Sequence, residues 1–137
     1  MSYTFINRAD VPVVLQRELS ECGAAALDMV FAFYGKRVPW QELLTETINE
    51  KGLCSAASIV RAAHKHGFDA HGYKRDISLI RGMEMPCILY WNYCTFVVLE
   101  GFEGDQVYII DPAVGTVACS LEDVEKSYTG VCLTVRP

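Results

Sequence analysis

Residues 20–35 read SECGAAALDMVFAFYG, a pattern that is typical of one helix. Ser20 is a residue type that favours the N-cap position, and Gly35 one that favours the position just past a helix end. Strong helix formers lie between them, and their apolar side chains occupy nearly the whole circumference. We therefore predict a central helix that is buried on most of its sides.

The sequence around this segment predicts more helices, followed by strands. Pro12 disfavours a helical conformation before it, so residues 11–16 should be extended. Pro39 suits a first helical turn and Gly67 a helix end, which predicts helices over 39–48 and 55–66. Later segments predict strands over 68–73, 87–91, 95–102, 106–111 and 131–135, a hairpin turn at 104–105, a helical turn over 76–81 and a helix over 120–128. This order is typical of an α+β fold.

Composition limits the kinds of protein that this chain can be. A length of 137 residues suits one domain, residues 1–137, with a sizeable core. The net charge of -5 argues against a nucleic-acid partner, which needs a basic face. No apolar run approaches the roughly 18 residues of a membrane span, and the first ten residues lack the layout of a signal peptide. We expect a soluble, cytosolic domain.

The cysteines favour free thiols over disulfides or metal ligands. Without a signal peptide, a reducing compartment is the expected one. The sequence has no CxxC pair and no zinc-type Cys/His spacing, so we expect no structural metal. Most of the cysteines lie in apolar runs and should be small buried hydrophobes. The six positions are 22, 54, 87, 94, 119 and 132, and only Cys22 stands apart because of its place.

Cys22 falls in the first turn of the predicted central helix. Free backbone N–H groups and the helix dipole favour a thiolate there. Gly23 and the alanines after it should leave the backbone open to a substrate. Taken alone, a cysteine at a helix start is more often a core residue than a nucleophile, so the neighbouring residues have to decide.

Three separated motifs follow one another along the chain. Residues 16–27 fit the pattern Q-x4-E-C-G-x-A-x-L, residues 96–101 read FVVLEG, and residues 111–115 read DPAVG. In this order they resemble the motifs of the C39 peptidases, the N-terminal domains of bacterial ABC exporters that mature double-glycine leader peptides. The residues are most similar to those of exporters of lanthipeptide-type peptides. The resemblance implies a papain-like cysteine peptidase fold with the N-terminal helix packed on an antiparallel sheet.

The resemblance also assigns roles to residues. Cys22 matches the nucleophile, Gln16 the side chain of the oxyanion hole, and Asp111 the residue that orients the catalytic histidine. The histidine position itself reads Thr95, inside an otherwise unbroken match. Threonine cannot accept a proton at neutral pH, and loss of a general base costs about 10²–10⁴ in rate. The alternative readings are a solvated amide at Gln16 and a strand-end cap at Asp111.

No other side chain in the sequence is expected to take the role of the missing catalytic histidine. His64, His66 and His71 follow no motif position, and the first two should be solvated residues at a helix end. Cys94, beside Thr95, reads as core filler and not as a second nucleophile.

Two hypotheses remain. The first is a cysteine endopeptidase that cuts after Gly-Gly, weakened by Thr95. The second is a non-catalytic docking domain for the same leader. Both imply a precursor whose amphipathic helical leader ends in Gly-Gly, and an exporter whose transmembrane and ATP-binding parts lie outside this chain, at the cytoplasmic side of a bacterial membrane. Neither needs a cofactor or metal, and the sequence does not decide whether Thr95 is natural or introduced.

Overall fold

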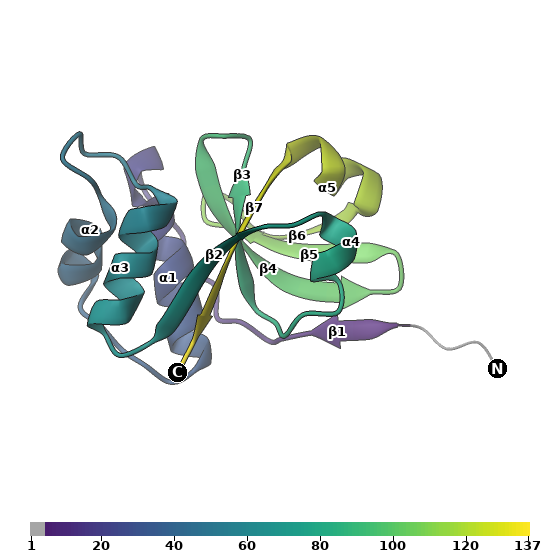
Figure 1. Cartoon of the computed structure of the whole chain (residues 1–137), viewed down its shortest axis with the longest axis horizontal. Helices are drawn as coiled ribbons and strands as arrows, with labels where there is room; N and C mark the ends of the chain where they lie inside the picture. The colour runs from purple at the N-terminus through teal and green to yellow at the C-terminus, as the bar shows by residue number, and fades with distance from the viewer. Residues whose placement is uncertain (1–4) are drawn as a thin grey trace.

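One antiparallel sheet runs through the centre of the molecule, with helices on both of its faces (Figure 1). The structure is a computed structural model that describes residues 5–137. The helical elements are η1 (Leu19–Glu21), α1 (Cys22–Phe33), α2 (Trp40–Thr47), α3 (Ala56–Lys65), α4 (Ile77–Ile80) and α5 (Leu121–Ser127). The strands are β1 (Ile6–Arg8), β2 (Asp69–Lys74), β3 (Cys87–Trp91), β4 (Thr95–Glu103), β5 (Gln106–Asp111), β6 (Gly115–Ser120) and β7 (Tyr128–Arg136).

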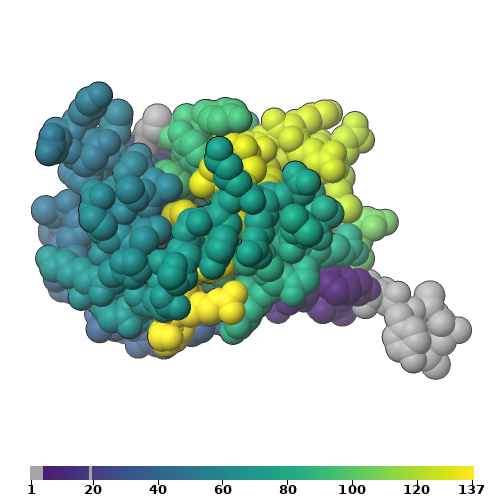
Figure 2. Space-filling view, in the orientation of Figure 1, coloured from purple at the N-terminus to yellow at the C-terminus, as the bar shows by residue number. Residues whose placement is uncertain are grey.

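The strand order is β2-β7-β3-β4-β5-β6, and β1 pairs with β4. β3 pairs with β4 only as far as Leu99, and β1 then pairs with the rest of that edge, from Gly101 to Glu103. In the space-filling view β1, in purple, lies along the lower edge of the molecule (Figure 2). The α+β class and the antiparallel sheet agree with the prediction.

β4 is the centre of the sheet and separates two cores. Its residues from Phe96 to Phe102 are all buried. Because side chains alternate along a strand, Phe96 and Val98 pack into the cluster around α1 to α3, while Val97 and Leu99 pack into the cluster under α4 and α5. Helices on both faces explain why this strand reads as a continuous apolar run.

α1 is the buried central helix that the sequence predicts, but it begins one residue later than expected. Ser20 lies in η1 and does not cap the helix. Glu21 stands at the N-cap with helical backbone angles, and its carboxylate instead accepts hydrogen bonds from the backbone N–H groups of Arg17 (2.7 Å) and Glu18 (3.3 Å). The 3-10 turn runs directly into α1, so the first residue of the α-helix is Cys22.

Two strands were missing from the prediction. β1 is three residues long and is defined by its pairing with β4, so its sequence is too short to show the alternation of a strand. β6 is an edge strand whose middle residues are mostly exposed, and it lacks the apolar alternation that would have indicated it. Residues 11–16, predicted to be extended, form no regular element. Among residues 5–137, no helix is both long and apolar enough to cross a bilayer.

Candidate functional site

Cys22 is the first residue of α1 and is fully buried. Its sulfur lies 2.9 Å from the sulfur of Cys54. The hydrogen bond with Cys54 lowers the pKa of the Cys22 thiol, burial opposes this, and hydrogen bonds from the Thr95 side chain and from the backbone N–H groups of Phe96 and Gly23 add to the lowering. Several donors therefore surround the sulfur at a helix N-terminus, a setting that favours a thiolate.

Cys54 is the part of the site that sequence reasoning missed. Cys54 lies just before α3, pairs with Ile48 in an isolated antiparallel β-bridge, and is half-buried. The shared hydrogen bond with Cys22 raises the pKa of the Cys54 thiol, so Cys54 holds its proton more tightly than Cys22 does. Cys54 is 32 residues from Cys22 in the sequence. From the sequence it was expected to be one of the small buried hydrophobic residues.

Gly23 lets these two sulfurs meet. A Cβ at Gly23 would lie 2.9 Å from the Cβ of Cys54, a distance that real Cβ atoms essentially never show, and at a tight 3.2 Å from the Ile59 side chain. The prediction that Gly23 and the alanines after it stay open to a substrate is therefore wrong. Ala24 and Ala25 are fully buried as well, because small residues at this end of α1 allow close packing of the neighbouring segments.

A reciprocal cap fixes the start of α3 and with it the position of Cys54. The Ser55 hydroxyl accepts a hydrogen bond from the Ser58 backbone N–H (3.1 Å), and the Ser58 hydroxyl accepts one from the Ser55 backbone N–H (3.0 Å). The Ser58 hydroxyl also lies 2.8 Å from the carbonyl of Thr47 and can donate to it, at the end of α2. This network ties α2 and α3 together directly behind the thiol pair.

The Thr95 side chain lies beside Cys22, close enough to lower the pKa of its thiol. Thr95 opens β4 and pairs with Trp91 across a tight turn. Asn92 and Tyr93 in that turn both have a φ of 54°, which brings the chain round within three residues. Cys94, expected in the core, is exposed in this turn. A hydroxyl, and not an imidazole, therefore faces the Cys22 sulfur.

The histidines lie elsewhere, around α3 and β2. His64 Nε2 is 2.9 Å from the carbonyl oxygen of Ala70, and His71 Nε2 is 2.8 Å from Asp69 Oδ1. His66 was predicted to be solvated, but its side chain is only 12% exposed. It packs edge-on to Phe31, at 5.9 Å between ring centroids, because the end of α3 lies against α1 and α2.

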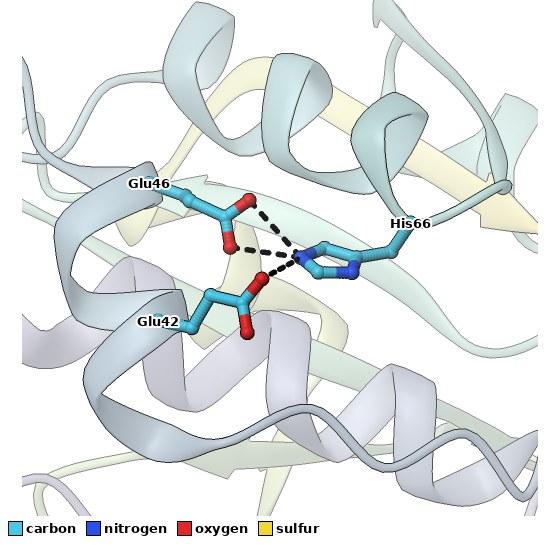
Figure 3. A group of neighbouring side chains, drawn as sticks. All are labelled: Glu42, Glu46 and His66. Carbon is cyan, nitrogen blue, oxygen red and sulfur yellow. Dashed lines mark hydrogen bonds and ion pairs between the residues drawn. The ribbon is translucent and has the colours of Figure 1, made fainter.

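His66 and two glutamates of α2 form a compact ionisable cluster (Figure 3). His66 Nε2 lies 2.8 Å from Glu46 Oε1 and 3.8 Å from Glu42 Oε1. One ligand-type atom from each residue falls within 4.8 Å of the others, so the trio has donors that a divalent cation could use. Lys65 Nζ lies 3.4 Å from Glu46, however, and already supplies a positive charge.

Gln16 and Asp111 come together through the backbone. The Gln16 N–H donates to the carbonyl of Pro112 at 2.8 Å. Asp111 Oδ1 accepts from the Ala113 N–H at 2.9 Å, which is the turn cap considered as an alternative from the sequence. The buried amide oxygen of Gln16 has no hydrogen-bond partner among residues 5–137. No hydrogen bond within this described range joins the pair Gln16 and Asp111 to Cys22.

β4 and β5 are neighbouring strands, and their register ends at the pair Val98 and Ile110. Thr95 lies three residues and Asp111 one residue beyond that pair, at the same end of the two strands.

A cavity of about 340 Å³ adjoins the thiol pair. Two of its walls are exposed apolar side chains, Leu53 (58% exposed) and Tyr93 (75%). Cys54 lines this cavity, and the fully buried Cys22 sulfur lies behind it, in contact with the Cys54 sulfur. The remaining lining residues are Ser20, Tyr90 and Cys94.

Comparison with known proteins gives consistent matches. The family model described as Peptidase C39 family matches residues 10–137. The colicin V secretion/processing ATP-binding protein of Escherichia coli is 32% identical over 93% of this chain and 18% of its own length. The lactococcin-G-processing and transport ATP-binding protein of Lactococcus lactis is 28% identical over 91% and 19%. The chain thus spans about a fifth of these curated relatives.

Solved structures match over nearly the whole chain. A double glycine motif protease from an AMS/PCAT transporter, crystallised in complex with the leader peptide, is 40% identical with a TM-score of 0.91, over 96% of this chain and 94% of the other. The peptidase domain of Streptococcus ComA, a bi-functional ABC transporter, is 26% identical with a TM-score of 0.84, over 94% and 98%.

Proposed function

This chain belongs to the Peptidase C39 family, and from that premise we propose that it binds the leader of a double-glycine precursor peptide at the cavity beside Cys22. The single observation that carries the proposal is the thiol of Cys22, held at a helix N-terminus among hydrogen-bond donors and next to an apolar-walled cavity. The likeness to a protease solved with its leader peptide supports it.

The shape of the site suits glycine next to the reacting bond. Cys22 is buried behind Cys54, so a side chain on the residue that approaches it would meet the packed wall formed with Gly23. The leader upstream would add its apolar side chains to the surface of Leu53 and Tyr93, as an amphipathic helix does in a groove. That the precursor is of lanthipeptide type stays a prediction.

Cleavage would start from the Cys22 thiolate. Its sulfur would attack the carbonyl carbon of the second glycine, and the oxyanion would be stabilised by the Cys22 N–H and the Gln16 amide. The leaving amine then needs a proton, and water must later be activated to release the peptide from the thioester. Thr95 supplies neither step, and Asp111 has no histidine to orient, so we expect slow turnover.

A non-catalytic docking role is the second candidate. Thr95 at the Cys22 sulfur and the distant placement of all three histidines favour it. In both cases the leader would be handed to transmembrane and ATP-binding parts of an exporter at the cytoplasmic side of the membrane. The curated relatives, of which this chain spans about a fifth, support that assembly.

One experiment separates these roles. The leader peptide bound in the 40% identical structure, extended past Gly-Gly by a short labelled tail, is incubated with this chain. Fluorescence anisotropy measures binding, and mass spectrometry detects a product ending in Gly-Gly. Product that disappears in Cys22→Ala supports the peptidase, and binding without product supports docking. The absence of both binding and product would refute the proposal.

A matched pair of surface variants tests the location. Leu53→Asp should weaken leader binding by about tenfold or more, since it puts a charge on the apolar wall. Leu79→Asp changes an equally exposed leucine on α4 (63% against 58% exposed), outside the cavity lining, and should leave affinity unchanged. Equal effects of the two variants would place the leader elsewhere.

A further inference from the structure

We propose that Cys22 and Cys54 form a redox-active dithiol pair, which peroxide converts into an intramolecular disulfide with Cys54 as the resolving cysteine. The pair is defined by the 2.9 Å contact between the two sulfurs and by Gly23, whose missing side chain lets the Cys54 side chain approach α1. Because the sulfurs already touch, closing a bond between them needs little rearrangement of the backbone.

The other cysteines do not share this arrangement. Cys87 and Cys132 are buried in the second core, where burial raises the pKa of both thiols and disfavours reaction. Cys119 is half-buried on β6, and burial raises its pKa as well. Cys94 is exposed and lines the same cavity as Cys54, which makes it the natural competitor for pairing.

The surroundings give the two sulfurs different roles. Donors around Cys22 favour its thiolate, the nucleophilic form, while Cys54 retains its proton. Cys54 is half-buried at the cavity wall, in front of Cys22, so peroxide would approach the pair from the cavity side. A low-pKa thiol next to a second thiol is the arrangement of cysteines that oxidise reversibly.

The reaction balances with peroxide as the only co-reactant. The Cys22 thiolate attacks one oxygen of hydrogen peroxide, the O–O bond breaks, and the leaving hydroxide takes a proton to become water. The Cys54 sulfur then attacks the Cys22 sulfenic acid, the S–O bond breaks, and the departing hydroxide takes the Cys54 proton. Two thiols lose two electrons, and one peroxide becomes two waters.

This disulfide would remove the Cys22 thiolate and cover the cavity wall. It would therefore protect the sulfur from irreversible oxidation to sulfinic acid and return it on reduction by a dithiol. The inference concerns covalent chemistry of this chain alone, so it holds or falls independently of leader binding and cleavage.

The test follows thiols in the reduced chain after one equivalent of hydrogen peroxide. We expect the chain to lose two of its six thiols and the mass of two hydrogens, with a single cross-linked peptide pair joining Cys22 and Cys54, and dithiothreitol should restore both. Cys94→Ser should behave identically. Cys54→Ser and Cys54→Ala should instead accumulate a sulfenic acid on Cys22, trapped by dimedone, and then gain further oxygen.

Three results would overturn the proposal: a disulfide between Cys54 and Cys94, direct oxidation of Cys22 to sulfinic acid in the unmodified chain, or no change in thiols. Two Cys54 variants guard against a folding defect, because circular dichroism and thermal unfolding identify whichever remains folded. If the leader peptide binds while no Cys22–Cys54 disulfide forms, only this inference fails. If the disulfide forms and no leader binds, only the proposed function fails.

Discussion

Arg8 Nε donates a hydrogen bond of 2.7 Å to Glu100 Oε1, and this ion pair fastens the N-terminal segment to the central strand β4. The Glu100 side chain is only 5% exposed, and its other oxygen accepts from the Val11 N–H at 3.3 Å. The Ala9 N–H adds a bond of 2.9 Å to the Glu100 carbonyl. The chain that leads to Gln16 is therefore held by one buried carboxylate.

Removing either partner of this ion pair should destabilise the fold unequally. Arg8→Met leaves the Glu100 carboxylate buried with only the Val11 N–H, and should lower the free energy of unfolding by about 2–3 kcal/mol. Glu100→Gln keeps the shape without the charge and should cost about 1 kcal/mol less. Urea denaturation measures both, with Arg17→Met, at an exposed arginine, as the control. An equal loss in all three variants would contradict the assignment.

Gly101 should not tolerate a side chain. Its φ is 152°, and a Cβ there would lie too close to the Asn7 carbonyl oxygen and the Arg8 backbone. Gly101→Ala should detach β1 from β4, costing about 2 kcal/mol or more and accelerating hydrogen exchange at residues 6–8. Gly82→Ala, with open space around the added Cβ, is the control. Unchanged exchange in Gly101→Ala would show that β1 pairs differently.

The cap of α3 should act on the thiol pair as well as on stability. Ser55→Ala removes the Ser55 hydroxyl from the cap just after Cys54 and should cost about 1 kcal/mol. Ser120→Ala removes a similar cap, that of α5, whose hydroxyl accepts from the Asp123 N–H at 3.1 Å. Both should lower the unfolding free energy similarly, but only Ser55→Ala should slow peroxide-driven loss of thiols. Equal rates would mean that the cap does not position Cys54.

The Cys22 thiol should titrate below its ordinary pKa of 9.0. Ultraviolet absorbance of the thiolate, as the difference between this chain and Cys22→Ala, measures the midpoint. Cys54→Ala should raise it, because the hydrogen bond with Cys54 is the largest cause of the lowering. A midpoint at or above that of free cysteine would contradict the donor arrangement.

The same shift has a consequence for stability. The folded chain holds the Cys22 proton more weakly than the unfolded chain does, so this contribution to stability is present above the unfolded pKa and lost as pH falls through the folded one. Between these two pKa values, lowering the pH should therefore reduce the free energy of unfolding of the unmodified chain relative to that of Cys22→Ala. Urea denaturation across this range checks the sign.

Restoring an imidazole at position 95 should restore a base. Thr95→His places it beside Cys22, at the end of β4 that adjoins the end of β5 at Asp111, and should raise the cleavage rate of a double-glycine peptide by about 10²–10⁴. Thr95→Asn introduces a polar side chain that cannot accept a proton and should give no gain. If adding Asp111→Asn to Thr95→His leaves the gain intact, Asp111 does not orient the imidazole.

Local patterns in the sequence predicted most elements of the fold. The all-round apolar segment indicated a buried central helix, and α1 is one. The apolar run around residues 96–99 indicated a buried strand, and the turn at Gly104 and Asp105 joined it to the next in a hairpin. Helix periodicity and turn chemistry act within a few residues, so a single sequence contains them. Exposed β6 and three-residue β1 lacked such a pattern and were missed.

The site was predictable only in part. The family pattern assigned Cys22 and Thr95 to one site, and in the structure the Thr95 side chain lies beside the Cys22 sulfur. The roles of Cys22, Gln16, Thr95 and Asp111 stay predictions. Gly23, which allows the close approach, was the only sequence feature that could have indicated Cys54. Nothing else in the sequence links two cysteines that are 32 residues apart. His66 was wrongly expected in solvent because the glutamate that pairs with it, Glu46, comes from another helix.

The sequence alone therefore determined the central helix, the class of the fold and the thiol at the helix start, because each depends on residues close together in the chain. Only the tertiary structure decided that the thiol is buried, that a second thiol touches it, and which side chains enclose the cavity beside it. These features depend on how distant segments pack, and packing is set by the shapes of side chains that meet only after the chain has folded.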